Sequence, residues 1–310
     1  MIKKYLSLAF MSLCVAVLTS SCGSDDLNPV SVFDGETREL NEFDLWLKKN
    51  YTDLYNINFN YRYSDKQTDQ TYNVIPAEYD KSVALAKLVR HVWLDAYAEA
   101  MGADFMKTYT PREIQLIGSY EFNSNGSQVM GTAEGGLKIM LYGVNELDID
   151  NPRINSDNPY ASKYEKPMDM NYWFFHTMHH EFCHILTQKK NYSTDYQTIS
   201  AGKYHSADWI NVSDKDAAKE GFVTGYGSGE YNEDFAEMYS TYVTMTPAGW
   251  QMIINQAGGE DSEGGIALNQ KLTMIKEYFL NSWGVDLDHM RDIVLRRSAE
   301  APSLDLRTLD

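Results

Sequence analysis

The segment His180-Glu181-Phe182-Cys183-His184 is the most informative part of this sequence for predicting the fold. On a helix, residues four positions apart lie on the same face, with Cβ atoms about 5–6 Å apart. His180 and His184 could therefore hold one Zn²⁺ through Zn–N bonds of about 2.0–2.1 Å. Glu181 stands at the edge of that face, where it can reach a water on the metal without being a ligand. The spacing predicts a helix that carries a zinc site and an adjacent base.

The residues around this stretch, 168–190, predict the helix itself. They contain no glycine or proline after Pro167, and they end on two lysines that suit a helix C-terminus. Asp169 or Asn171 is expected to cap the N-terminus. Apolar residues recur at helical spacing, which predicts a buried helix with one polar stripe: Trp173, Phe174, Met178, Phe182, Ile185 and Leu186.

Two further histidines of this helix compete with the pair. His176 and His180 are also four residues apart, but Thr177 would then occupy the position of the base. His179 and Cys183 form another such pair, on a different face. We expect His176 and His179 to be packed or hydrogen-bonded residues rather than metal ligands.

Residues 1–21 predict a lipoprotein signal peptide. Two lysines precede an apolar run that is too short to span a membrane comfortably. Leu18-Thr19-Ser20-Ser21-Cys22 resembles a bacterial lipobox, which implies cleavage before Cys22 and acylation of that cysteine. Ser24-Asp25-Asp26 resembles the export signal of surface-displayed outer-membrane lipoproteins. The alternative is an ordinary secretory signal with an incidental cysteine.

Charge and cysteine content limit the partners and the means of stabilisation. The 310 residues carry a formal net charge of −17, which does not favour nucleic acid or anionic lipid as a partner. If Cys14 leaves with the signal and Cys22 carries lipid, only Cys183 remains, so the fold depends on its core and not on a disulfide. Residues 22–38 predict a lipidated tether, and residues 39–310 can form one domain or two lobes around a cleft.

The periodicity of the remaining chain predicts an α+β fold. Before the motif, helices are expected at about 40–55 and 77–101, and strands at 57–63, 113–122 and 136–143. The glycine-containing residues 131–136 are expected to be a loop.

The strand at 137–142 has two interpretations. It is either an edge strand that pairs with extended substrate beside the motif helix, or an ordinary internal strand. After the motif, residues 191–228 lack periodicity and could form one wall of a cleft. Residues after Thr246 predict a helical lobe of two or three helices.

A second acidic cluster, residues 226–237, opens a helix that runs to about Met245. Glu233, Asp234 and Glu237 compete for the role of third metal ligand. Helical geometry places Glu233 and Glu237 on one face and turns Asp234 about 100° away. One of the first two could bind zinc while the other holds a ligand histidine by its second nitrogen. The alternative is a solvated acidic face on an acidic protein.

Two known groups share these motifs. Asn232-Glu233-Asp234-Phe235-Ala236 is similar to the third-ligand segment of gluzincins such as the thermolysin and aminopeptidase groups. A longer similarity, to anthrax lethal factor and its relatives, covers His180 to His184, then Tyr226-Gly227, then Glu233 to Glu237. Both resemblances imply Glu233 as the ligand. The second adds Tyr226 as proton donor or oxyanion stabiliser, and Glu237 as support for a ligand.

With the lipobox, the chain resembles the substrate import-associated zinc metallohydrolase lipoproteins. This resemblance implies that residues 39–310 are a zincin-like catalytic domain, with a small mixed sheet whose edge strand lies over the motif helix. It implies a gluzincin-type peptidase with one Zn²⁺ on His180, His184 and Glu233, and with Glu181 as base. It also implies an outer-membrane lipoprotein exposed at the cell surface, anchored by lipid alone. The implied partners are peptide or protein substrates, glycoproteins included, and an outer-membrane import complex.

Two alternatives remain open at this stage. One is a non-catalytic surface lipoprotein that keeps a metal for stability and binds a nutrient or a receptor; its sequence would not need Glu181. The other is a zinc hydrolase that acts on a non-peptide amide or on glycosylated protein.

Overall fold

The structure is a computed structural model, and it describes residues 39–64, 72–123, 126, 128–129, 131–134 and 137–309. The chain divides into two units, Met1–Leu40 and Asn41–Asp310, and every described helix and strand belongs to the second. The predicted signal peptide and tether, residues 1–38, lie outside the described residues. Within the described part of the chain, no helix is long and apolar enough to cross a membrane.

The first helical segment begins at a capping box. The side chain of Asn41 accepts a hydrogen bond from the backbone N–H of Asp44, and the Asp44 carboxylate accepts one from the backbone N–H of Asn41. Two backbone donors at the helix start are thereby satisfied. The segment confirms the helix predicted for about 40–55 and contains α2 (Glu42–Leu47), η1 (Lys48–Thr52) and α3 (Asp53–Tyr55).

One long helical segment follows and confirms the prediction for 77–101. It is continuous through α4 (Tyr79–Val89), η2 (Arg90–Leu94) and α5 (Asp95–Met101), and α6 (Ala103–Tyr109) comes next. Apolar residues of this segment are buried in the main core: Val83, Leu85, Leu88, Val89 and Val92.

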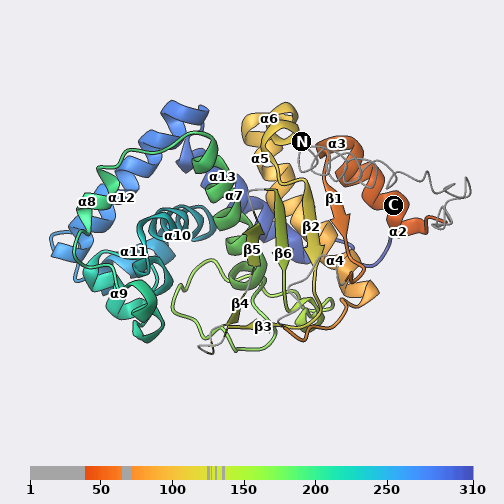
Figure 1. Ribbon diagram of the computed structural model, residues 1–310, viewed down its shortest axis with the longest axis horizontal. Coiled ribbons are helices and arrows are strands. Elements are labelled where there is room, and N and C mark those ends of the chain that lie inside the picture. Colours follow the sequence, from red (N-terminus) through yellow and green to blue (C-terminus); the bar gives the residue numbers. More distant parts are fainter. Residues whose placement is uncertain are drawn as a thin grey trace, which may run out of the picture. The chain divides into compact units, whose positions relative to one another are not determined.

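The N-terminal half of the domain contains a four-stranded sheet of order β1-β2-β6-β5 (Figure 1). Its members are β1 (Asn58–Asn60), β2 (Glu113–Leu116), β6 (Lys138–Leu141) and β5 (Gly131–Glu134). The first three are parallel, and β5 runs antiparallel to β6. Phe59, Ile114 and Ile139 are neighbours across three strands and are buried. The α+β prediction is confirmed, because this small mixed sheet is combined with a mainly helical remainder.

The edge strand beside the motif helix is β5, so the edge interpretation of residues 137–142 is wrong. That stretch contains β6, which pairs with β2 on one side and with β5 on the other. β5 itself contacts helix α7 (His176–Lys189). The loop expected at 131–136 is a strand over 131–134. Gly-Thr-Ala-Glu has no apolar alternation, and backbone pairing alone defines the strand, so the sequence pattern could not reveal it.

The strand predicted for 113–122 is interrupted at Gly118. Its backbone N–H donates to Ile75 O at 2.8 Å, and a Cβ at this position would lie 2.1 Å from Pro76 O. This close approach of another backbone segment ends β2 and leaves residues 121–122 to a separate hairpin, formed by β3 (Glu121–Phe122) and β4 (Gln128–Val129). A 3₁₀ turn, η3 (Val144–Glu146), follows β6.

Helix α7 lies between the sheet and the C-terminal helices (Figure 1). It continues from η4 (Asn171–Phe175), and together they confirm the helix predicted for 168–190. Asp169 caps its start by accepting hydrogen bonds from the backbone N–H groups of Asn155 and Asn171, both at 3.0 Å. On the other side, α7 packs against α10 (Tyr231–Thr244).

The stretch 191–228 is more ordered than predicted. It forms four short helical segments, which are α8 (Tyr196–Ile199), η5 (Ser206–Asn211), α9 (Asp214–Glu220) and η6 (Tyr226–Ser228). Each spans about two helical turns or less. A segment that short contains too few residues for a hydrophobic repeat to be recognised in the sequence.

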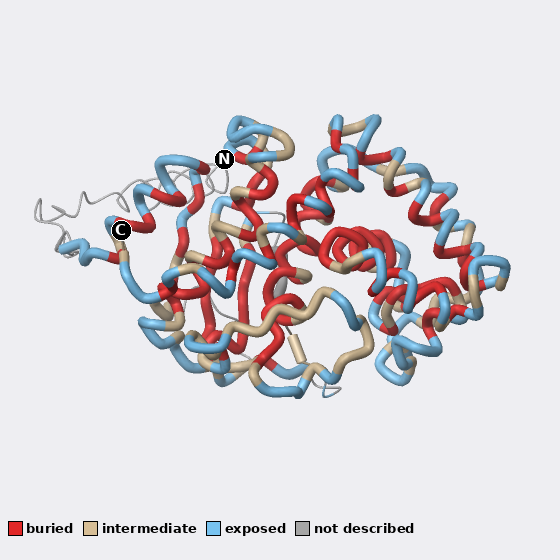
Figure 2. Tube along the Cα trace, turned by 180° about the vertical axis from the view of Figure 1, so that it is seen from behind, coloured by how far each residue is buried: buried red, intermediate tan, exposed pale blue. Residues whose placement is uncertain are grey.

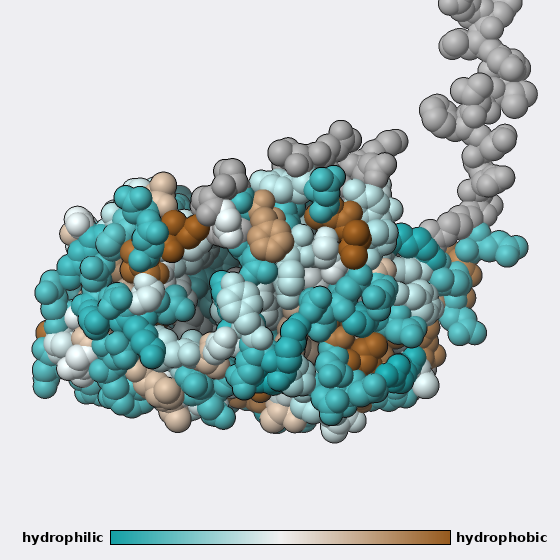
Figure 3. Space-filling view, turned by 90° about the horizontal axis from the view of Figure 1, so that it is seen from below, coloured by the Kyte–Doolittle hydropathy of each residue, from teal (hydrophilic) through white to brown (hydrophobic). Residues whose placement is uncertain are grey.

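The C-terminal lobe is helical, as predicted. It contains α11 (Pro247–Gln256), α12 (Glu263–Tyr278), η7 (Phe279–Trp283), α13 (Leu287–Glu300) and η8 (Ala301–Ser303). Helix α13 contacts α10 and also returns to α5 in the N-terminal half, where Arg296 and Arg297 both bind Glu99. Figure 2 shows the buried residues gathered in the interior of both halves. The side seen in Figure 3 is mainly hydrophilic with small, separate hydrophobic areas, in keeping with the acidic composition.

A buried ion pair fixes the start of α10. Lys271 Nζ lies 2.7 Å from Asp234 Oδ2, and both side chains are completely buried. Two further hydrogen bonds support the pair: Lys271 donates to Gly221 O at 2.7 Å, and Tyr204 donates to Asp234 Oδ2 at 2.9 Å. This pair joins α12 to the turn of α10 that begins beside Glu233.

We predict that Lys271→Met lowers the free energy of unfolding by about 3–5 kcal/mol, because it leaves the Asp234 carboxylate buried without its cation. Urea denaturation of the metal-free protein measures this difference. Lys219→Met is the control, since Lys219 pairs with Asp216 at 2.7 Å on the exposed surface and should cause no measurable loss. Equal midpoints for the two variants would contradict the role given to the buried pair.

Candidate metal centre

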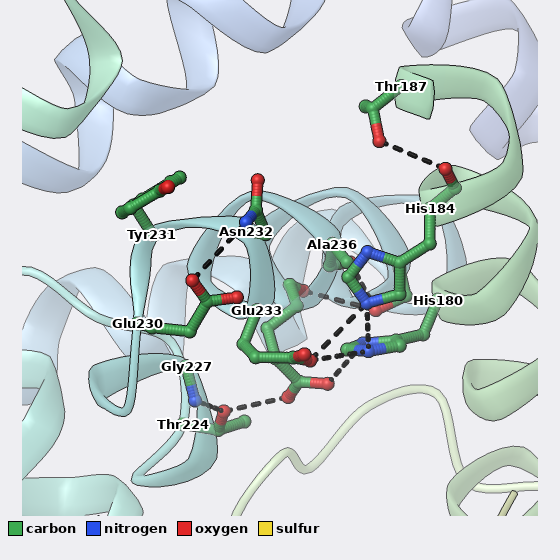
Figure 4. A network of polar contacts seen from close by, with 12 residues as sticks. His180, His184, Thr187, Thr224, Gly227, Glu230, Tyr231, Asn232, Glu233 and Ala236 are labelled. Carbon is green, nitrogen blue, oxygen red and sulfur yellow. Dashed lines mark hydrogen bonds and ion pairs between the residues drawn. The ribbon is translucent and has the colours of Figure 1, made fainter. Parts of the chain in front are cut away.

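Helix α7 brings two imidazole nitrogens together. His180 and His184 are one helical turn apart, and their Nε2 atoms are 3.0 Å from each other. The two rings are nearly perpendicular, with an interplanar angle of 81°. Both nitrogens therefore point at one common position beside the helix, as the sequence predicted (Figure 4).

Helix α10 brings a carboxylate to the same position. Oε2 of Glu233 lies 3.0 Å from His180 Nε2 and 3.3 Å from His184 Nε2. In Figure 4 the Glu233 side chain points from α10 toward both rings. Burial by itself raises the pKa of Glu233, but its hydrogen bonds with His180 and His184 outweigh burial and hold the pKa far below its usual value. Glu233 is thus an ionised acceptor at neutral pH.

The spacing of these three atoms fits a zinc ion. Tetrahedral coordination with bonds of about 2.0–2.2 Å separates the ligand atoms by about 3.3–3.6 Å. The three observed separations are 3.0, 3.0 and 3.3 Å, close to one face of such a tetrahedron. Two imidazoles and one carboxylate are also a ligand set of catalytic zinc sites, which leave the fourth position open. The residues present therefore fit Zn²⁺.

The structure distinguishes the three carboxylates that the sequence left in competition. Asp234 faces away from the histidines and pairs with Lys271 in the core. Glu237 lies one turn beyond Glu233, behind His180, with Oε1 2.8 Å from His180 Nδ1. Glu233 alone of the three approaches the Nε2 atoms of both His180 and His184.

Glu237 sets the orientation of His180. When the Nδ1 proton is directed at Glu237, Nε2 of the neutral ring carries the free lone pair that a metal needs. In the metal-free state, burial lowers the pKa of His180, but Glu233 and Glu237 together outweigh burial and raise this pKa well above its usual value. A metal ion must therefore displace a proton from His180 Nε2.

A second group of potential donors shares His180. Atoms of His176, His180 and Glu237 also lie within 4.8 Å of one another. These atoms, however, already satisfy each other: His176 Nε2 is 2.9 Å from Glu237 Oε1 and 3.2 Å from the Ser240 hydroxyl. His180, His184 and Glu233 all line the cavity beside Glu181, whereas His176 and Glu237 do not, so the first group is the one that a metal and a substrate can reach. His176 is hydrogen-bonded, as the sequence analysis expected.

His179 also has the structural role that was expected. It is completely buried, and its Nδ1 lies 3.0 Å from the Tyr97 hydroxyl, which in turn bonds to the Tyr239 hydroxyl. Burial lowers the pKa of His179 to about 3, so its ring is neutral at physiological pH. It faces away from the metal donors, on the side of α7 that packs against α5 and α10.

Glu181 has the properties of a general base held beside the site. It follows His180 on α7, retains 8% exposure and lines the cavity in front of the metal donors. Burial raises the pKa of Glu181, while His180 and His184 lower it in part. A carboxylate with a raised pKa accepts a proton more readily than one free in water.

Tyr226 faces the metal donors from η6. Its ring centroid is 5.9 Å from that of His180, and Trp209 packs edge-on against it at 5.0 Å. Burial, and then the negative charge of Glu233, raise the pKa of Tyr226 well above its usual value. The phenol therefore keeps its proton at neutral pH and can donate a hydrogen bond in the cavity.

A cavity of about 620 Å³ opens in front of these groups. One wall comes from the end of α7 and from residues 191–197, and the opposite wall comes from residues 226–233. The predicted contribution of 191–228 to a cleft wall is thus confirmed. Polar side chains predominate among the residues that line it beyond the predicted site: Thr187, Gln188, Asn191, Tyr192, Thr194, Gln197, Glu230 and Asn232.

Three kinds of residue in and around the cavity were not predicted from the sequence. Thr187 and Gln188 could have been found, because they follow His184 by three and four positions and so share its helix face. Thr224 could not, because it acts through a hydrogen bond to Glu237 that no spacing rule indicates. The wall residues within 191–197 depend on the local fold of that stretch, which the sequence showed only as irregular.

Comparisons with known proteins identify the family to which this α+β chain belongs. The sequence profile of the family described as "Putative zinc-binding metallo-peptidase" matches residues 36–288, and the chain belongs to this family. It is also similar to the crystal structure of "a putative zinc-binding metallo-peptidase from Bacteroides caccae ATCC 43185". The two are 40% identical with a TM-score of 0.70, over 90% of this chain and 100% of that one. No curated protein matches the sequence.

We predict that Glu233→Gln abolishes stoichiometric zinc binding, because an amide oxygen carries no charge and is a far weaker ligand. Zinc content after dialysis, measured by elemental analysis, tests this. Glu230→Gln is the matched control: Glu230 lies on the same wall, three residues earlier, but is not among the grouped donor atoms. Retention of one zinc per chain by Glu233→Gln would exclude Glu233 as a ligand.

Proposed function

We propose that the protein hydrolyses peptide bonds with zinc as its cofactor. One observation carries the proposal: three donor atoms converge within 3.0–3.3 Å of each other beside Glu181, at the base of an open cavity. A metal kept for stability alone needs neither a base next to it nor an accessible cavity. The family to which the chain belongs supports the same activity.

His180, His184 and Glu233 would hold the ion. A zinc ion bound there polarises a carbonyl group and makes a water molecule more acidic. The chain contributes the geometry: α7 fixes both imidazoles, and α10 fixes Glu233, so the donors need no rearrangement to form the site. Glu237 and His176 keep the His180 ring in the orientation described above.

Glu181 would move the protons of the reaction. It accepts a proton from the water that attacks the scissile carbonyl carbon, and it then donates that proton to the nitrogen of the leaving amine. The raised pKa that burial gives Glu181 suits both steps, since the group must gain and release the same proton. Its position directly after His180 keeps it at the edge of the ligand face.

Tyr226 would stabilise the charge that develops on the carbonyl oxygen, or protonate the leaving amine. Its phenol is protonated at neutral pH and stands on the wall opposite α7. A hydrogen-bond donor held in place before the reaction stabilises an oxyanion without paying for reorganisation during it.

Glu181→Gln is expected to keep one zinc per chain and to lower peptide cleavage by about 10²–10⁴-fold, because it removes the base and no ligand. Purified residues 23–310 would be assayed for zinc content and for cleavage of casein and of a peptide library. Zinc in both proteins with cleavage by wild type alone supports the proposal. Zinc in both with cleavage by neither would favour a metal-stabilised binding protein and overturn it.

We also propose that the domain is tethered by lipid on Cys22 to the outer membrane, exposed at the cell surface and associated with a nutrient-import complex. The support is the lipobox-like segment and the acidic residues after it, with the resemblance to import-associated lipoproteins. We expect radiolabelled palmitate to enter the wild-type chain and not Cys22→Ala. Protease added to intact cells should degrade the protein. A chain that takes up no palmitate and resists the added protease would exclude this location.

A further inference from the structure

Thr224 lies at the junction between the two halves of the site. Its hydroxyl donates a hydrogen bond to Glu237 Oε2 at 2.7 Å and accepts one from the backbone N–H of Gly227 at 3.0 Å (Figure 4). Glu237 belongs to α10, whereas Gly227 belongs to η6, the turn that carries Tyr226. The Thr224 hydroxyl thus connects Glu237, which contacts His180, to the turn that carries Tyr226.

Glu237 uses both of its oxygens, in an ion pair with His180 and in hydrogen bonds with His176 and Thr224. Oε1 faces His180 Nδ1 at 2.8 Å and His176 Nε2 at 2.9 Å, while Oε2 receives the Thr224 hydroxyl. With donors on both oxygens, the carboxylate cannot rotate about its χ3 axis without breaking at least one bond. Thr224 therefore helps to fix the oxygen that directs the Nδ1 proton of His180.

The turn of Tyr226 is held against α10 by close packing as well. A Cβ on Gly227 would lie 3.4 Å from Glu237 Cβ and 3.5 Å from Asp234 Cα, so this turn rests directly on the helix. Trp209 covers the Tyr226 ring from the side, and the ring faces His180. The Thr224 hydroxyl adds its two hydrogen bonds at this contact.

We propose that Thr224 is a positioning residue that sets the orientation of His180 and the placement of Tyr226 together, through its two hydrogen bonds. The expected effect of Thr224 on the rate of cleavage rests on the proposed function, whereas its expected effect on zinc affinity does not. Thr224 itself touches neither the metal position nor the substrate; it acts through Glu237 and through the 226–228 turn.

A purely structural interpretation is available and has a matched counterpart in the same chain. Thr246 makes the same pair of bonds elsewhere: it accepts from the backbone N–H of Gly249 at 3.2 Å and donates to Asp157 at 2.8 Å. If Thr224 only caps a turn, Thr224→Val and Thr246→Val should differ in nothing but their effects on stability.

The test compares Thr224→Val, Thr224→Ser and Thr246→Val with wild type. We expect Thr224→Val to weaken zinc binding by about tenfold, as loss of support for a ligand histidine does, in a competition assay with a chelator. Thr224→Ser should restore wild-type affinity, because it keeps the hydroxyl. Thr246→Val should leave zinc affinity unchanged, and thermal melting of the metal-free proteins shows whether each variant is folded.

Kinetics at saturating zinc separate the second bond from the first. Thr224→Val should lower kcat by about tenfold with little change in KM, because it misplaces a group that acts in the transition state. In a Tyr226→Phe background the same substitution should have less than about a twofold effect, since the group that it misplaces is already absent.

Each outcome decides the matter. Unchanged zinc affinity in a folded Thr224→Val protein overturns the connection to His180. Equal losses of kcat in the two backgrounds overturn the connection to Tyr226. If wild type binds zinc but cleaves nothing, the proposed peptidase fails, and the zinc affinities alone still support or overturn the role of Thr224 at His180.

Discussion

The crossing of α7 and α10 is centred on the buried His180, whose two ring nitrogens each face a carboxylate. Both carboxylates belong to α10, with Glu233 at Nε2 and Glu237 at Nδ1. These glutamates are four residues apart and so lie one turn from each other on the same face of their helix. The crossing of α7 and α10 can therefore not slide or rotate by one residue without leaving a buried nitrogen or carboxylate unpaired, which is costly.

The rest of the C-terminal lobe maintains this crossing. Lys271 of α12 pairs with Asp234, between the two glutamates in sequence but on another side of the helix. Helix α13 packs on α10 and on α5, and thereby joins the lobe to the half of the domain that carries the sheet. A site with two carboxylates on α10 close to His180 is thus held by a frame of contacts that do not involve the donor atoms. This explains why the donor atoms already lie at ligand spacing.

The residues whose role follows from local spacing were predictable, and those whose role depends on distant contacts were not. The helix around His180 follows from hydrophobic periodicity, and the grouping of His180, His184 and Glu181 follows from an i, i+4 motif. The choice between Glu233 and Asp234 depends on Lys271, 37 residues after Asp234, and only the resemblance to known families indicated it. The edge strand 131–134 has no side-chain pattern. Thr224 is significant only because its hydroxyl reaches Glu237 across the helix–turn contact.

The return of α13 to α5 has a consequence for how the molecule comes to be assembled. Arg296 bonds to Glu99, a residue 197 positions earlier, so the last long helix completes a contact with one of the first. Contacts between residues so far apart in sequence close slowly during folding. The metal donors, in contrast, span only residues 180–233. Because α13 packs on α10 as well as on α5, the helix that carries Glu233 is held in part by a long-range contact and not only by its neighbours in sequence.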